Sequence, residues 1–332
     1  MGWLLRIVLR FLFEKILKLL LLLFAVCTLS FWMVELSPID PIRAYVGADL
    51  MVVSPEQREA IARHWGLDQP PAERYRQWLS AILQGDLGTS MIYRRPVAEV
   101  ISERFLNSLP LLFSAWLLSG LIGFAAGVIA AVKRDTWIDR LIKGYCYTLV
   151  STPSFWVGIL LMMIFSVWLG WLPVGLSVPI GVPAEEVTWS DRLRHMILPA
   201  LTLGLVGISA VALHTRQKMI DVLGSEYVLF ARARGEKGFV LLWRHGLRNA
   251  ALPAITLQFA SLNELFGGAV LAEQVFSYPG LGRVTIEAGL RGDVPLLLGI
   301  VLFSTLFVFV GNTAADLLYR LLDPRMREGD AP

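Results

Sequence analysis

Residues 105–132 read FLNSLPLLFSAWLLSGLIGFAAGVIAAV, and no side chain in this stretch carries a charge. About 20 consecutive apolar residues suffice for an α-helix to cross the bilayer core, which is about 30 Å thick. A helix that is apolar on every side must be surrounded by protein or by lipid. The stretch therefore predicts a membrane-spanning helix and indicates an integral membrane protein.

Five further segments of this kind predict an all-α membrane protein with six transmembrane helices. They lie at 16–34, within 144–170, and at 196–215, 250–272 and 294–318. The composition agrees, because 55% of the 332 residues are hydrophobic and 17% are charged. A formal net charge of +3 does not indicate a nucleic-acid partner.

Basic residues in the connecting segments predict the orientation, because cytoplasmic loops carry an excess of Lys and Arg. Residues 1–18 contain four basic residues and one acid, 133–143 four against two, and 216–248 seven against three. The connections at 170–195 and 273–293 each contain two basic and three acidic residues. We therefore expect a multi-pass protein of the bacterial inner membrane with both termini in the cytoplasm.

The first apolar segment resembles a secretory signal, because four basic residues precede it. No small-x-small cleavage site follows, so an uncleaved anchor is expected. The two cysteines, Cys27 and Cys146, lie in apolar stretches and are interpreted as packing residues.

The connection at 37–104 is predicted to face outward and to be helical. Ser54, Pro55 and Gln57 form a capping-box pattern, and Gly66 ends that helix. Further helices are predicted at 69–83, before Gly85, and at 96–105. Either a helical cap on the outer membrane surface or a solvated connector fits this pattern.

Residues 216–253 form the most informative connection. A short helix is predicted at 226–234, ended by Gly235, and a second helical run at 238–249. Tyr227 and Phe230 stand among charged residues on the short helix. Such a face suits docking into a groove of a partner protein, and it equally suits an interfacial helix on anionic lipid.

The same segment resembles the coupling-helix signature of the dipeptide/oligopeptide/nickel branch of ABC importer permeases. The resemblance rests on an ordered set of motifs: ARARG at 231–235, RHGLRNAALP at 244–253, GDLGTS at 85–90, RPV at 95–97, TPSFW at 152–156, WLP at 171–173, ILP at 197–199, FSYPGLG at 276–282 and DPRMR at 323–327. The broader importer signature has Glu-Ala-Ala at 229–231 and a proline at position 248. This chain has Leu-Phe-Ala and Arg248 there, as in the peptide/nickel branch.

The resemblance implies a type I ABC importer permease fold with three parts. These are an N-terminal segment with the first span (1–36), a periplasmic helical loop (37–104) and a permease core (105–332). The coupling helix would lie at about 224–240. The residues implied to couple the permease to an ATPase are Tyr227, Phe230, Ala231, Arg232 and Gly235.

The implied partners are a second homologous permease, two ATPase subunits, a periplasmic or extracellular solute-binding protein and membrane lipid. The chain has no Gly-x-x-x-x-Gly-Lys-Ser/Thr loop, so ATP hydrolysis is expected on separate chains. The chain itself is expected to be a transport subunit without enzymatic activity or cofactor. The substrate stays open among dipeptide, oligopeptide, nickel and a metal chelate.

Glu264, beside Asn263, is a carboxylate within the predicted fifth span. Intramembrane ionisable groups face protein or a water-filled path. Glu264 and Asn263 are therefore candidates for the pathway, where the carboxylate would meet a metal ion, a chelate or a peptide amino terminus. A structural hydrogen bond is the alternative for Glu264.

Several polar groups at span ends have simpler interpretations. Asp316 is expected to pair with Arg320, Arg216 to extend toward the membrane interface, and His214 to take a polar packing role. The role of His195 stays open.

Two other function classes make different predictions for this sequence. An ion-gradient-driven secondary transporter using Glu264 and Asp316 predicts activity without ATP. A membrane-embedded enzyme would need a catalytic cluster within the membrane, and the sequence shows none.

Overall fold

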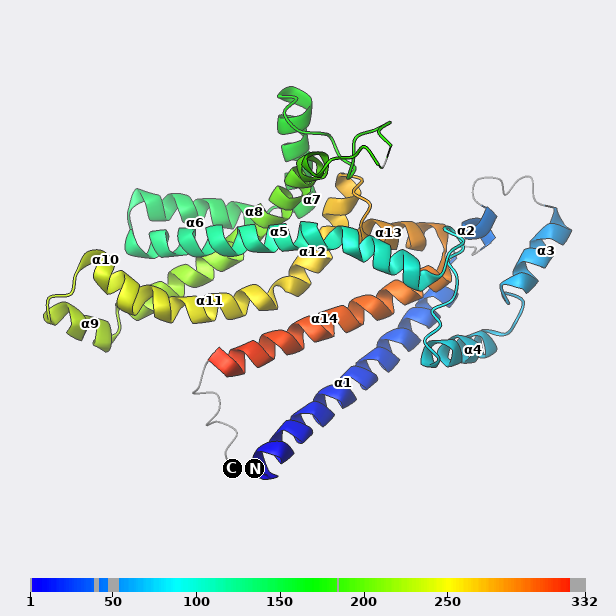
Figure 1. Cartoon of the computed structure of the whole chain (residues 1–332), viewed down its shortest axis with the longest axis horizontal. Helices are drawn as coiled ribbons and strands as arrows, with labels where there is room; N and C mark the ends of the chain where they lie inside the picture. The colour runs from blue at the N-terminus through cyan, green and yellow to red at the C-terminus, as the bar shows by residue number, and fades with distance from the viewer. Residues whose placement is uncertain (1, 39–41, 47–53, 184, 323–332) are drawn as a thin grey trace. The chain divides into compact units, whose positions relative to one another are not determined.

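The computed structural model describes residues 2–38, 42–46, 54–183 and 185–322. Figure 1 shows their helices. The helices are α1 (Gly2–Glu35), α2 (Ile42–Val46), α3 (Pro55–His64), α4 (Pro71–Leu83), α5 (Val97–Val132), α6 (Trp137–Val150), α7 (Ser154–Met162), α8 (Trp189–Leu223), α9 (Glu226–Ala233), α10 (Gly238–Leu241), α11 (Arg248–Ala260), α12 (Leu262–Val275), α13 (Leu281–Arg291) and α14 (Val294–Leu322), with π-helices η2 (Met163–Trp168) and η3 (Leu242–Leu247).

Four helices in the described residues are long and apolar enough to cross a membrane. They are Phe13–Glu35 within α1, all of α5, all of α8, and Val294–Leu317 within α14. These helices confirm the predicted first, second, fourth and sixth spans. The charge-free length of each segment was sufficient to find them.

The third predicted span is not one straight helix. It is formed by α6 and by α7 with η2, which together pass the same test but are bent by 105°. Pro153 stands directly before α7, and a proline disfavours the helical conformation of the residue before it. The third span within 144–170 therefore stays a prediction, which the bent pair allows as a broken span.

The fifth predicted span is formed by two helices. These are α11, of 13 residues, and α12, of 14 residues, which meet at Ser261. Each is shorter than the about 20 residues that a straight crossing requires. The total of six transmembrane helices stays a prediction.

The helix predicted at 96–105 is present from Val97 but is not separate from the second span, because these residues open the 36-residue helix α5. No glycine interrupts the region, and α5 continues through Pro110. The proline removes one backbone donor, and its own carbonyl accepts a 2.7 Å hydrogen bond from Ser114 Oγ. An apolar face of this segment is buried, with Val97 and Val100 at most 2% exposed.

Local signals set the ends of the short helices as predicted. The Ser54 side chain accepts from the Gln57 amide, and the Gln57 side chain accepts from the Ser54 amide. Gly66 and Gly85 end α3 and α4 at φ +64° and +83°, a region that glycine enters without steric cost.

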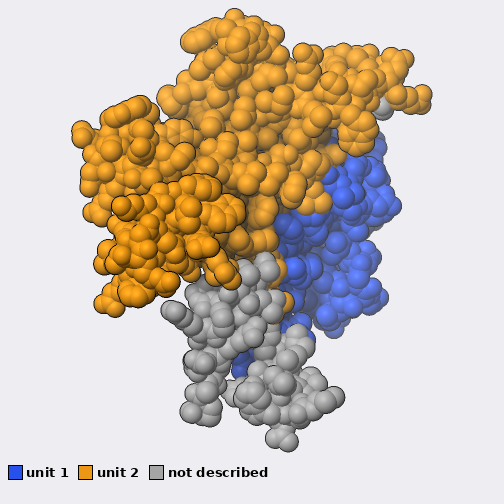
Figure 2. Space-filling view, turned by 60° about the vertical axis from the view of Figure 1, so that its left-hand side comes forward, with its two compact units in different colours: residues 1–106, 283–310 blue, residues 107–282, 311–332 orange. Residues whose placement is uncertain are grey.

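Internal contacts divide the chain into two compact units, coloured separately in Figure 2. Unit 1 comprises residues 1–106 and 283–310. Unit 2 comprises residues 107–282 and 311–332.

In unit 1, helix α4 of the loop packs on α1. Tyr75 and Trp78 contact the buried Phe31 ring, with ring centroids 5.2 and 5.7 Å away. An ion pair of 3.0 Å joins Arg74 to Glu35 at the end of α1. This part of the loop is therefore attached to the first span rather than being a free connector.

In unit 2, small residues allow α5 and α8 to approach closely. A methyl group added at Gly123 would lie 2.7 Å from Val211 Cβ, and one at Gly127 would lie 2.6 Å from the Ala212 carbonyl oxygen. This is the close helix contact expected from the Gly-x-x-x-Gly pattern. Cys146 is fully buried against α8, as its interpretation as a packing residue predicted.

Candidate functional site

Helix α9 forms where the sequence predicts the short docking helix. It begins after Ser225 and ends in a Schellman motif at Gly235. The Gly235 amide donates to Arg232 O at 2.9 Å, and the Glu236 amide donates to Ala231 O at 3.1 Å. Gly235 has φ +93°, a conformation that L-residues rarely adopt, so the turn after α9 requires glycine.

One face of α9 is buried within the chain itself. Val228 is fully buried and Ala231 is 6% exposed, and both pack with Leu241 of α10. Val222 and Leu223, at the end of α8, complete this cluster. Helix α9 is therefore attached to both α8 and α10, and Ala231 belongs to that attachment rather than to the outer face.

The opposite face of α9 presents large apolar side chains. Phe230 is 65% exposed and Tyr227 is 47% exposed. The Arg234 guanidinium lies 6.0 Å from the centre of the Phe230 ring, and Arg232 of the same helix is also exposed. The exposed face therefore combines aromatic surface with positive charge, which suits a partner that offers an apolar groove with acidic edges.

Side-chain contacts connect residues of the segment after Gly235 to one another and to α9. Glu236 lies 3.1 Å from His245 Nε2 and 3.6 Å from Arg244 Nη1. The Tyr227 ring lies 6.3 Å from the His245 ring. The predicted helical run at 238–249 is present but does not end there, because α10, η3 and α11 follow one another without a break.

Arg216, which was predicted to extend toward the membrane interface, has a side-chain partner that the sequence did not predict. It forms a bidentate pair with Asp139, through Nε to Oδ1 at 2.6 Å and Nη2 to Oδ2 at 2.7 Å. Asp139 is fully buried and also has Lys143 at 3.5 Å. A buried carboxylate requires such partners, so the pairing joins α6 to α8. Sequence spacing does not reveal it, because the two residues are 77 positions apart.

Glu264 lies in the first turn of α12, directly after the junction at Ser261, and is exposed. A carboxylate in this position is favoured by the positive end of the helix dipole. The side chain of Asn263 lies outside the described side chains. The same holds for the side chain of Arg320, the predicted partner of Asp316. Whether Glu264 lines a pathway stays a prediction.

The two histidines interpreted from sequence occupy ordinary packing positions. His195 Nδ1 hydrogen-bonds to Gly175 O at 2.6 Å, a structural role that the sequence left open. His214 is partly buried.

Family models match almost the whole chain. The model described as "Binding-protein-dependent transport system inner membrane component" matches residues 123–328. A model of the N-terminal region of such membrane components matches residues 8–111.

Relatives among characterised proteins are similar over nearly their full length. The glutathione transport system permease protein GsiC of Salmonella paratyphi A is 38% identical over 322 residues, which cover 96% of this chain and 99% of that protein. The oligopeptide transport system permease protein AppB of Bacillus subtilis strain 168 is 35% identical over 308 residues, which cover 92% of this chain and 95% of that protein.

Two solved structures share the fold. The MetNI methionine ABC transporter in inward facing conformations matches with a TM-score of 0.55 at 15% identity, covering 68% of this chain and 97% of that chain. An amino acid ABC transporter matches with a TM-score of 0.51 at 15% identity, covering 67% of this chain and 94% of that chain.

Proposed function

The chain belongs to the family of binding-protein-dependent transport system inner membrane components, and we propose that it is a permease subunit of an ATP-driven peptide importer. It is a multi-pass inner-membrane protein and not an enzyme; ATP hydrolysis in such transporters belongs to separate chains. The family implies a partner permease, an ATPase and a substrate-binding protein.

The observation that carries the proposed mechanism is the two-sided packing of α9. Its buried face, with Val228 and Ala231, is fixed to α8 and α10. Its exposed face, with Tyr227 and Phe230, is free to enter a groove on the ATPase. A displacement of α9 by the ATPase would then move α8 and α11, because α10 and η3 lead into α11 without a break.

Such a displacement would switch the access of the pathway from one side of the membrane to the other. Inverting a two-state population from 1:99 to 99:1 requires about 5.5 kcal/mol, which ATP binding on the partner can supply. Tyr227, Phe230 and Arg232 would touch the ATPase in this scheme. Ala231 and Gly235 would hold α9 in position.

We propose a peptide as the substrate class, because GsiC and AppB are named for glutathione and oligopeptides. Glu264 would meet the amino terminus of the peptide in the pathway, together with Asn263. Nickel or a chelate stays a prediction from the sequence neighbourhood of Glu264.

We further propose the arrangement predicted from the charges and the family resemblance. Both termini are cytoplasmic, the 37–104 segment faces the periplasm, and 105–332 forms the permease core. The complete importer would contain two different permeases, two ATPase subunits and one solute-binding protein.

Site-directed crosslinking tests the docking of α9. The background replaces Cys27 and Cys146 with alanine, and Phe230→Cys is labelled with a thiol-reactive photocrosslinker in the assembled transporter. We expect an adduct with the ATPase. The matched control is Trp137→Cys, at a side chain that is 71% exposed at the predicted cytoplasmic end of α6; it should give none.

Adducts with lipid alone from Phe230→Cys would reject the docking and favour the interfacial helix. Uptake by reconstituted vesicles without ATP would instead reject the proposed function as a whole.

A further inference from the structure

Two exposed aromatic rings follow the turn at Gly235. Phe239 of α10 is 71% exposed and Trp243 of η3 is 64% exposed. The two rings stack on each other, with centroids 6.0 Å apart and an interplanar angle of 28°. They therefore form one continuous apolar surface on α10 and η3, whereas the proposed docking face for the ATPase belongs to α9.

The segment that carries these rings is basic. Residues 237–263 contain one Lys, two Arg and no acidic residue. The three cations, Lys237, Arg244 and Arg248, are exposed. Arg244 Nη1 lies 3.6 Å from Glu236, beyond the distance of a direct hydrogen bond. In the part of the chain that the structure describes, neither Lys237 nor Arg248 has an ion-pair partner.

The packing of η3 indicates its depth in the membrane. Leu242 packs on the cluster that contains Val128 and Ala131, in the last turns of α5. Lys133 and Arg134 follow directly and end that span. The η3 segment therefore lies at the level where the apolar sequence of a span gives way to charge.

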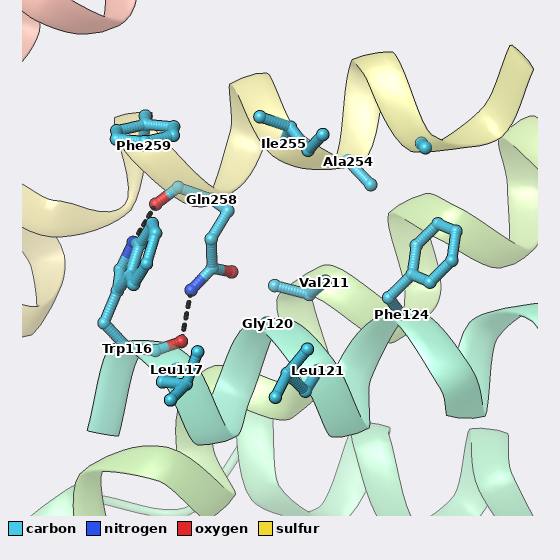
Figure 3. A pocket seen from close by; sticks show the side chains of 11 residues that line it. Trp116, Leu117, Gly120, Leu121, Phe124, Val211, Ala254, Ile255, Gln258 and Phe259 are labelled. Carbon is cyan, nitrogen blue, oxygen red and sulfur yellow. Dashed lines mark hydrogen bonds between the residues drawn. The ribbon is translucent and has the colours of Figure 1, made fainter. Parts of the chain in front are cut away.

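The same boundary appears along the helix that η3 enters. Arg248 is the first residue of α11, and no other charged residue follows as far as its end at Ala260. In Figure 3, Ala254 and Ile255 of α11 line an apolar groove together with Phe124 of α5. The helix thus changes from basic to apolar within two turns, as expected where a chain enters a bilayer from the cytoplasm.

Three kinds of ligand offer negative charge to this face. A soluble phosphate compound could pair with the cations, but it would leave the stacked rings in water. A partner protein would have to enter the headgroup layer, because Leu242, next to Trp243, packs at the end of a span. An anionic phospholipid is present at this depth, brings a phosphate for the cations, and provides the interfacial layer that aromatic rings favour.

We propose that α10 and η3 form a binding site for an anionic phospholipid of the cytoplasmic leaflet. Its phosphate pairs with Arg244 and Arg248 and replaces the long contact between Arg244 and Glu236. The rings of Phe239 and Trp243 lie in the headgroup layer. The site goes beyond the proposed transport function and uses only the proposed cytoplasmic position of this end. Because η3 leads into α11, the bound lipid would hold the segment through which a displacement of α9 passes.

Lipid photocrosslinking in the complete transporter tests the ligand. The transporter is reconstituted in nanodiscs that contain phosphatidylglycerol or phosphatidylcholine, each with a photoreactive group next to the glycerol backbone. Labelled peptides are identified by mass spectrometry. We expect phosphatidylglycerol to label residues 237–249 more strongly than phosphatidylcholine does. Arg244→Gln combined with Arg248→Gln should lower that labelling at least about fivefold, the factor that one basic residue contributes near an anionic surface.

Arg134→Gln combined with Arg140→Gln is the matched control. Both arginines are exposed at the connection between α5 and α6, and their replacement removes the same amount of positive charge. Labelling of residues 237–249 should stay at the wild-type level in this variant. All proteins are compared at equal membrane abundance and with the ATPase copurified.

Four results would overturn the inference. Equal labelling by the two lipids would mean general contact with the bilayer, and an equal loss in both double variants would mean unspecific attraction. Labelling of residues 237–249 by neither lipid would assign the face to the ATPase or to another protein. Loss of labelling on addition of inorganic phosphate would assign the cations to a soluble anion. Uptake without ATP would reject the proposed function, which this lipid measurement does not use.

Discussion

Ser90 and Asp293 stand 203 positions apart, and the Ser90 hydroxyl donates a 2.6 Å hydrogen bond to Asp293 Oδ2 in the interior of unit 1. The same carboxylate oxygen accepts from the Ile92 amide at 2.9 Å. Oδ1 accepts from the Leu296 amide in the first turn of α14. One buried side chain thus caps a transmembrane helix and fastens the GDLGTS segment to it.

Replacing this carboxylate should destabilise unit 1. Asp293→Ala leaves the buried donors without an acceptor, which costs about 1–3 kcal/mol. The measurement is the thermal unfolding midpoint of the detergent-solubilised protein. Asp86→Ala is the control, because Asp86 accepts from Gly88 N in an exposed turn. Equal midpoints for the two variants would show that the Asp293 contacts contribute little.

The Asp139–Arg216 pair predicts a larger effect. Asp139→Asn leaves the Arg216 guanidinium, 14% exposed, without its counter-charge, and breaking such a pair costs about 3–5 kcal/mol. Arg216→Lys keeps the charge but loses the bidentate geometry, so its effect should be intermediate. The control is Arg134→Lys, in an exposed pair with Asp135, where about 0.5 kcal/mol or less is expected. If chemical unfolding gives the same free energy of unfolding for Asp139→Asn and wild type, this account is contradicted.

Gly235 should matter for coupling more than for folding. Gly235→Val places a β-branched residue at φ +93°, which costs at least about 1–2 kcal/mol, although no atom lies within 4 Å of the added Cβ. We expect the protein to insert normally but to transport less peptide per ATP hydrolysed. The readout is the ratio of uptake to ATP hydrolysis in proteoliposomes.

Gly85→Val is the matched control for this variant. Gly85 ends α4 at φ +83° in the same kind of motif, also with no atom within 4 Å of an added Cβ. The local backbone strain in Gly85→Val should be similar to that in Gly235→Val. Gly85, however, lies far from α9 in the sequence. A change of the coupling ratio in both variants, or in neither, would remove the special role of Gly235.

The pathway role of Glu264 predicts charge-selective uptake. Glu264→Gln removes the charge and keeps the shape, and uptake of a dipeptide with a free amino terminus should fall about fivefold. A fivefold change corresponds to ~1 kcal/mol, which is the attraction between two opposite unit charges 4 Å apart in water. Uptake of the N-acetylated dipeptide, relative to its own wild-type rate, should not change. Asp221→Asn, at another exposed carboxylate, is the control. An equal loss for both peptides would indicate a structural role for Glu264.

Tyr93 predicts a loss of stability at high pH. Burial and a 2.9 Å hydrogen bond from its hydroxyl to Glu287 Oε2 raise the pKa of Tyr93 to about 12. The ordinary value in the unfolded chain is about 10. Because the folded pKa is the higher one, this contribution is complete below pH 10 and is lost as pH rises toward 12.

The comparison of wild type with Tyr93→Phe isolates this effect. The phenylalanine cannot titrate, so the difference between the two unfolding midpoints should shrink between pH 10 and pH 12. It should stay constant between pH 7 and pH 9. A constant difference up to pH 12 would mean that Tyr93 ionises as easily in the folded protein as in the unfolded chain.

The amino-acid sequence by itself determined the features that depend on neighbours within a few residues. Long charge-free stretches identified α1, α5, α8 and α14, because a bilayer selects on length and polarity alone. The capping box at Ser54 and the turn at Gly235 were likewise readable. Their hydrogen bonds close within five residues, so the local pattern contains both partners.

Only the tertiary structure decided which distant groups meet. Asp139 pairs with Arg216, Ser90 with Asp293, and Gln258 with Trp116, in each case more than 70 positions apart. The 105° bend between α6 and α7 likewise had to be observed, although Pro153 allowed it. The physical reason is that a helical pattern specifies which faces are apolar but not which faces meet. That choice depends on close packing, as at Gly123 and Gly127, and on the need of every buried polar group for a partner.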